Sequence, residues 1–89
     1  MNKTINLKLK VVIANIKKVR QYRNYSQEYV AAKLLISQNA YSKVELGQSL
    51  ITIDRLILIA NIFQVEVKLL LSEENLSIAK LYKLRSVIK

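Results

Sequence analysis

The 89-residue sequence contains no cysteine, no histidine and no proline, and it has a single glycine. Without cysteine it can form neither a disulfide nor a thiolate metal site, so a hydrophobic core must hold the fold together. Without histidine or cysteine, and with no serine beside an evident base, nucleophilic and metal-hydrolytic catalysis lack their usual groups. The sequence therefore predicts a protein that is not an enzyme and that needs no cofactor or metal.

Acidic residues are also scarce, with six Asp and Glu against 15 Lys and Arg and a formal net charge of +9. Such an excess indicates a polyanionic partner, either nucleic acid or an anionic membrane surface. No apolar run approaches the roughly 20 residues that cross a bilayer, and the first ten residues lack the unbroken apolar stretch of a signal peptide. We therefore expect a cytoplasmic protein. A membrane-surface role is disfavoured, because the basic residues of the first predicted helix belong to a globular pattern that already uses its apolar face, and no membrane partner is expected.

A hydrophobic content of 52% over this length gives room for one compact core. No repeat, low-complexity tract or linker divides the chain. We expect an all-α fold in three segments: an N-terminal arm or strand at 1–11, a helical domain at 12–71 and a helical extension at 72–89.

The N-terminal segment alternates polar and apolar residues from Thr4 to Val11. A period of two predicts a strand, which would need a partner edge from this chain or from a second copy. A disordered basic arm is an equal alternative. An arm in the minor groove of DNA is less favoured, because four apolar side chains are poor groove ligands.

Helical spacing begins at Val12 and continues through Ile16, Val19 and Arg23, which predicts an amphipathic helix of about three turns. Asn24 can adopt the left-handed conformation that ends a helix. The sequence therefore predicts a helix stop at that residue.

Cap residues then predict two short helices. Ser26 caps a helix over 27–34, and Ser37 caps another that ends near Leu46. Gly47 follows where positive φ is needed. The inward face of the first of these helices is predicted to be Val30, Ala31 and Leu34.

Two further helices are predicted beyond Gly47. Thr52 caps a helix with an inward face of Leu56, Ile59, Ala60 and Phe63. The stretch 65–71 fits a strand or a short buried helix, and both interpretations stay open. Residues 72–89 predict a C-terminal helix whose narrow apolar seam, typical of packing on another helix, is Ser77, Leu81, Leu84 and Ile88.

The stretch from Gln27 to Val44 has the spacing of a helix-turn-helix, which needs a small residue at the helix contact and apolar side chains on the second helix. Ala31 is the small residue, and Tyr41 and Val44 are the inward positions. From about Val12 to Leu71 the sequence resembles the Xre, or phage Cro and repressor, family. The resemblance is carried by NIKKVR at 15–20, YSQEYVAAKL at 25–34, ISQNAYSKVELG at 36–47 and TIDRLILIANIFQV at 52–65.

This resemblance implies a five-helix bundle that binds double-stranded DNA as a homodimer, with the third helix, about 38–46, in the major groove. Gln38, Asn39 and Lys43 lie where the family reads base edges, and Ser42 faces the same side. Glutamine and asparagine amides can pair with adenine, and lysine can donate to guanine. The chemistry of these residue types therefore agrees with base reading.

Contacts to the DNA backbone are also implied. Gln27 matches a family residue that contacts phosphate from a helix N-terminus. Gln48 and Ser49 match a loop that contacts the backbone, and Lys33 and Arg23 are further candidates for phosphate contacts. A structural pair of Arg20 and Glu45 is implied between the first helix and the end of the third.

The sequence departs from the family pattern at three positions. Leu35 replaces the usual glycine in the turn, and Leu46 replaces a common polar residue. Tyr41 replaces a smaller aliphatic residue, so its hydroxyl must reach a polar partner.

The predicted function is sequence-specific DNA binding by a homodimeric transcriptional regulator. Two alternatives stay open. One is the antitoxin of a toxin-antitoxin pair that represses its own promoter and holds a protein partner through the N-terminal arm or the C-terminal helix. The other is a module that binds only protein.

Overall fold

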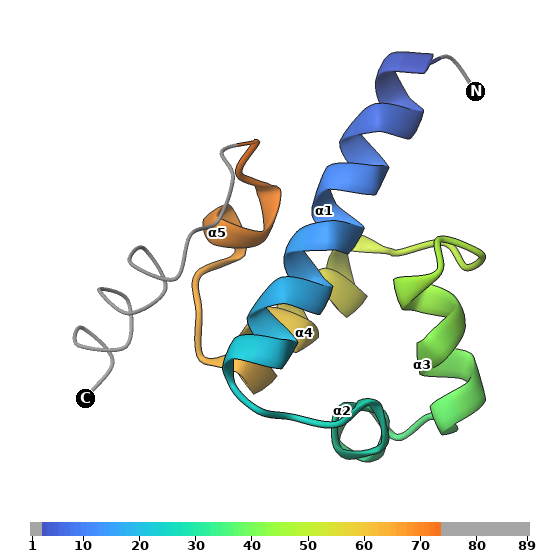
Figure 1. Cartoon of the computed structure of the whole chain (residues 1–89), viewed down its shortest axis with the longest axis vertical. Helices are drawn as coiled ribbons and strands as arrows, with labels where there is room; N and C mark the ends of the chain where they lie inside the picture. The colour runs from blue at the N-terminus through green and yellow to red at the C-terminus, as the bar shows by residue number, and fades with distance from the viewer. Residues whose placement is uncertain (1–2, 74–89) are drawn as a thin grey trace.

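The structure is a computed structural model that describes residues 3–73, with side chains described from Lys8 onward. Within that range it has five helices and no strand (Figure 1). They are α1 (Lys3–Tyr22), α2 (Gln27–Leu34), α3 (Gln38–Glu45), α4 (Ile53–Phe63) and α5 (Val67–Leu71). The long α1 contacts α5 on one side, α3 on the other and α4 behind it, while α2 packs against α3 and α4. The helical fold class is confirmed.

Hydroxyl caps begin three of these helices at the predicted positions, Ser26, Ser37 and Thr52. They accept hydrogen bonds of 3.0–3.1 Å from the backbone N–H groups of Tyr29, Ala40 and Arg55. Each such cap typically stabilises a helix by about 1 kcal/mol. The boundaries of these helices are therefore fixed by local chemistry that the sequence shows directly.

The hydrophobic core is formed by side chains of all five helices, and it includes every apolar inward residue predicted for α1 to α4. Its buried members are Val12, Ile16, Val19, Val30, Ala31, Leu34, Tyr41, Val44, Leu56, Ile59, Ala60, Phe63, Leu69 and Leu70. Seven of the larger side chains are less than 2% exposed. A core packed this tightly holds α3 in one orientation.

Asn15 connects α1 to the C-terminal part of the described chain. It is the one buried polar residue among those described, 6% exposed, and its Nδ2 donates to the carbonyls of Leu70 (3.0 Å) and Ser72 (2.8 Å). These bonds join α1 to the end of α5. The stretch 65–71 contains the helix α5 at Val67–Leu71, so the strand alternative for it is wrong.

The strand predicted for residues 4–11 is also wrong, because α1 begins at Lys3 and runs through that segment without a break. The apolar residues at 5, 7, 9 and 11 alternate as in a strand. Some of the same residues also belong to a stripe with helical spacing, which consists of Ile5, Leu9, Val12 and Ile16. The longer helical period, with no proline or glycine to interrupt it, prevails over eight residues of alternation. The predicted C-terminal helix lies outside the described residues from residue 74 onward.

Four of the residues in 3–73 have a left-handed backbone, and two of them, Asn24 (φ 61°) and Gly47 (φ 76°), are at predicted helix stops. Leu35 (φ 61°) and Gln64 (φ 58°) end α2 and α4 in the same way. At Leu35 the N–H groups of residues 35 and 36 close the α2 terminus onto the carbonyls of Ala32 and Ala31. The turn thus keeps its geometry although leucine replaces the family's glycine.

Replacing Leu35 by glycine is expected to stabilise the protein by up to about 1 kcal/mol. The left-handed conformation costs a residue with a Cβ roughly 1–2 kcal/mol, and the added chain entropy of glycine in the unfolded state offsets part of that relief. The Leu35 side chain is 91% exposed, so almost no burial is lost. Urea unfolding of Leu35→Gly measures the gain. Leu35→Ala, which keeps the Cβ, should show none, and equal stability of the two variants would contradict a strained turn.

Candidate nucleic-acid interface

The pair α2 and α3 forms the predicted helix-turn-helix: the two helices pack against each other, and the small side chain of Ala31 is buried. Ala31 is 2% exposed, and the inward side chains of α3, Tyr41 and Val44, are 0% and 3% exposed. Burial of one face leaves the other on the surface of the molecule, where Figure 1 shows α3 at the edge of the bundle. An exposed helix fixed by a buried face has the arrangement needed to enter a groove.

The residues predicted to read bases all lie on α3. Gln38, Asn39 and Lys43 are exposed, and Ser42 is half-buried. Gln38 and Asn39 occupy the first turn, directly after the Ser37 cap. The outer face of α3 therefore presents amide, hydroxyl and ammonium groups, which are the donors and acceptors that base edges recognise.

A polar cluster centred on Glu45 joins three helices behind this face. Arg20 of α1 forms a two-pronged ion pair with Glu45, from Nε to Oε2 at 2.6 Å and from Nη2 to Oε1 at 3.1 Å. Gln27 Nε2 donates to Oε1 at 3.0 Å, and the Tyr41 hydroxyl donates to Oε2 at 2.5 Å. Arg20 also donates to the carbonyl of Tyr25 at 2.9 Å. We call these four residues, Arg20, Gln27, Tyr41 and Glu45, the Glu45 cluster.

The Glu45 cluster holds its charges where water has little access. The side chains of Arg20 and Glu45 are 12% and 3% exposed. Burial alone would raise the pKa of the Glu45 carboxyl, but hydrogen bonds from Arg20, Tyr41 and Gln27 more than offset it, so that pKa lies below its ordinary 4.5. The hydrogen bond to Glu45 raises the pKa of Arg20, and burial raises the pKa of the Tyr41 phenol. Glu45 and Arg20 therefore stay charged and Tyr41 stays neutral at pH 7.

Acid should weaken the fold through Glu45. Because the pKa of this carboxyl is lower in the folded protein than in the unfolded chain, its stabilisation is complete above the unfolded value and is lost as the pH falls through the folded value. We expect the urea midpoint to fall as the pH drops below about 4.5, and to fall more steeply than in Glu45→Gln, which has no carboxyl to protonate there. Parallel pH profiles for the two proteins would show that Glu45 is not the group responsible.

The residues predicted to contact phosphate have different surroundings in the structure. Gln48 and Ser49 are exposed in the loop after α3, and Lys33 is exposed with its Nζ 5.5 Å from the Tyr29 ring centroid. Gln27 is half-buried and its amide N–H is directed to Glu45. Arg23 points to the end of α4, where Nε donates to the Phe63 carbonyl at 2.9 Å. The structure thus gives Arg23 a partner that ties α1 to α4.

Two structural features of this surface were not predicted from the sequence. The hydrogen bond from Tyr41 to Glu45 has a sequence signal, since the two residues are four apart and share one face of a helix. The Arg23 contact has none, because its acceptor lies 40 residues along the chain and is a backbone carbonyl. Local spacing can find the first kind of contact and not the second.

In residues 8–73, whose side chains are described, no group of three or more acidic side chains is placed to hold a metal ion. No helix in the described range is long and apolar enough to cross a membrane.

No curated protein and no solved structure matches the chain. A family model described as Helix-turn-helix matches residues 16–70, which span α2 and α3 and most of the bundle around them. The chain belongs to the family of Xre- and Cro-like helix-turn-helix proteins, a family of DNA-binding domains.

Proposed function

We propose that this protein is a transcriptional regulator that binds double-stranded DNA sequence-specifically as a homodimer, with α3 in the major groove. One observation carries the proposal: the outer face of α3 presents Gln38, Asn39 and Lys43 to solvent, while Tyr41 and Val44 fix its inner face in the core. A rigid helix with exposed amides and an ammonium can pair with base edges without first becoming ordered. Its place of action is the cytoplasm.

Contacts to the backbone would set the register of α3 on the duplex. Gln48 and Ser49 follow α3 directly and are exposed, and Lys33 lies in the last turn of the neighbouring α2. Gln27 stands at the N-terminus of α2, where a phosphate oxygen can meet backbone N–H groups and the positive end of the helix dipole. The net charge of +9 adds a sequence-independent attraction through counterion release. Phosphate contacts position the helix and base contacts then select the site.

The homodimer is supported by exposed apolar side chains on α4. Ile53, Ile57 and Leu58 are 70%, 42% and 50% exposed, which a second copy could cover. Two copies related by a two-fold axis would place their α3 helices one turn of DNA apart, roughly 34–36 Å. The operator would then be a pseudo-palindrome.

Selection of bound sequences from a random duplex library with the full chain tests the proposal. We expect a pseudo-palindromic consensus with half-site centres about 10–10.5 base pairs apart, and affinity for random duplex that falls steeply with salt. Failure to enrich any consensus, together with no salt-dependent binding to random duplex, would contradict a DNA-binding function. An enriched consensus without symmetry would contradict the homodimer alone.

A further inference from the structure

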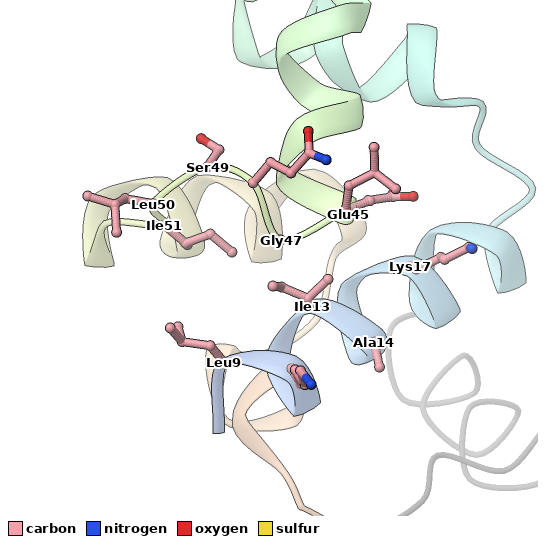
Figure 2. Close-up of a pocket in the computed structure, with 12 residues that line it drawn as sticks. Leu9, Ile13, Ala14, Lys17, Glu45, Gly47, Ser49, Leu50 and Ile51 are labelled. Atoms are coloured by element: carbon pink, nitrogen blue, oxygen red, sulfur yellow. The ribbon is translucent and has the colours of Figure 1, made fainter. Parts of the chain in front are cut away.

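An open groove of about 650 Å³ lies between the N-terminal half of α1 and the loop that joins α3 to α4. We call it the α1-loop groove. Figure 2 shows Leu9 and Ile13 of α1 facing Leu50 and Ile51 of the loop, with Gly47 on the loop side above Ile13. Six apolar residues line the groove: Leu9, Ile13, Ala14, Leu46, Leu50 and Ile51.

The loop side of this groove is unusually exposed for apolar residues. Leu50 is 86% exposed and Leu46 is 66% exposed, although the core of the same domain is almost fully buried. Large apolar side chains gathered around one groove indicate an interaction site. A small ligand would remain largely in water against a wall as exposed as Leu50, whereas small-molecule sites bury most of their ligand. The groove therefore suits a larger partner that covers the wall.

The charge around the groove selects among such partners. Lys10 and Lys17 line it from α1, both exposed, and neither forms an ion pair with any residue described. The one acid in the lining, Glu45, is already paired with Arg20 at 2.6 Å. The two lysines are seven residues apart, which is two helical turns or about 10 Å along α1. A second copy of the chain carries the same net charge of +9 and is a poorer complement than an acidic segment.

We propose that the α1-loop groove binds an acidic amphipathic helix of a partner protein. Two apolar residues one turn apart on that helix would insert between Ile13 and Leu50, as in other helix-in-groove complexes. Asp or Glu residues two turns apart would lie beside Lys10 and Lys17. The apolar contacts supply affinity, and the charged rim selects acidic sequences.

Occupancy of the groove is also expected to weaken DNA binding, and this consequence depends on the proposed function. Gln48 and Ser49, which we propose to contact phosphate, line the same groove. Carboxylates placed there would repel the DNA backbone, so the partner helix and DNA would oppose each other. Linkage requires the effect to be reciprocal.

Display of a library of about 14-residue helical peptides, selected on the full chain without DNA, tests the groove. Peptides that also bind the Leu50→Ser variant are then removed from the selected pool. This substitution alters the groove by making an already exposed position polar. We expect the enriched peptides to share apolar residues at helical spacing and an excess of Asp and Glu. Failure to enrich peptides that distinguish wild type from Leu50→Ser would overturn the proposal, as would enriched peptides with no acidic excess.

Matched variants locate the binding of one enriched peptide, followed by fluorescence anisotropy. Leu50→Ser and Lys17→Glu should each weaken it about five- to ten-fold. Leu71→Ser and Lys68→Glu make the same changes at exposed positions of α5 outside the groove and should leave it within about two-fold. Equal losses in groove and control variants would overturn the assignment. Sedimentation showing self-association that is lost in Leu50→Ser, with no peptide binding, would assign the groove to a second copy instead.

Competition with DNA is measured separately on the duplex selected for the free protein. The enriched peptide should lower the apparent DNA affinity at least five-fold at saturation, and duplex should weaken peptide binding by the same factor. Peptide binding without any effect on DNA would overturn the coupling. Absence of DNA binding by the free protein would instead count against the proposed function, and peptide binding would still test the groove by itself.

Discussion

Replacing Glu45 by alanine is expected to lower the free energy of unfolding by about 3–5 kcal/mol. The change leaves the Arg20 guanidinium, whose side chain is 12% exposed, without its anionic partner. It also removes the acceptor for the Tyr41 hydroxyl and the Gln27 amide. Breaking a buried ion pair from one side costs about this much, because the remaining charge stays desolvated and unpaired. Total stabilities of small domains are about 5–15 kcal/mol, so urea unfolding should show a large loss.

Two controls separate this effect from general loss of charge. Glu66→Ala removes an exposed carboxylate that makes no cap hydrogen bond at the start of α5, and it should change stability by less than about 0.5 kcal/mol. The double variant Arg20→Met/Glu45→Leu removes both charges and should recover part of the loss in Glu45→Ala. A loss of under about 1 kcal/mol in Glu45→Ala would show that water replaces the carboxylate and that the Glu45 cluster does not hold α3.

The helices of this domain could be predicted where one residue type decides a boundary. Ser26, Ser37 and Thr52 each begin a helix because a hydroxyl satisfies a free backbone N–H, and Asn24 and Gly47 stand at stops because they tolerate positive φ. These interactions span three or four residues, so the sequence shows both partners at once.

Local patterns gave a wrong prediction at one segment and left two other features of the chain undecided. Polar and apolar residues alternate over the short segment 4–11, which predicts a strand. The segment is part of α1 because the helical spacing of apolar residues continues after Val12. Local periodicity left 65–71 open between a strand and a helix, and the structure has α5 there, with the carbonyl of Leu70 bound by Asn15 from 55 residues away. Leu35 has positive φ although its residue type disfavours it, and the turn is closed by the backbone N–H groups of residues 35 and 36 on the carbonyls of Ala32 and Ala31.

The candidate site divides in the same way. Gln38, Asn39 and Lys43 were predicted because they match the positions at which the family that the sequence resembles reads base edges, and all three side chains are exposed in the structure. Arg23 could not be assigned, because a guanidinium at that position can meet solvent, phosphate or the Phe63 carbonyl equally well on local spacing. Which of the exposed residues contact DNA depends on how the DNA is bound, and substitution of single residues tests this.

Alanine at Asn39 or Gln38 is expected to weaken binding to the selected duplex by about 1–3 kcal/mol, roughly 5- to 150-fold, because each amide can make two hydrogen bonds to an adenine edge. Both side chains are exposed, so the free energy of unfolding should change by less than about 0.5 kcal/mol. Neither carries charge, so binding to random duplex and its salt dependence should be nearly unchanged. Fluorescence anisotropy on the selected and random duplexes measures the difference.

The matched control is Asn61→Ala, the same substitution at an exposed position of α4, which should leave both affinities unchanged. Lys43→Ala provides a second contrast, because it removes a charge as well as a donor and should weaken both duplexes and reduce the salt slope. Equal losses on selected and random duplexes in Asn39→Ala would contradict base reading and make α3 a backbone contact. A loss confined to the selected duplex would assign sequence choice to two amides on one turn of α3, held in place by Tyr41, Val44 and the Glu45 cluster behind them.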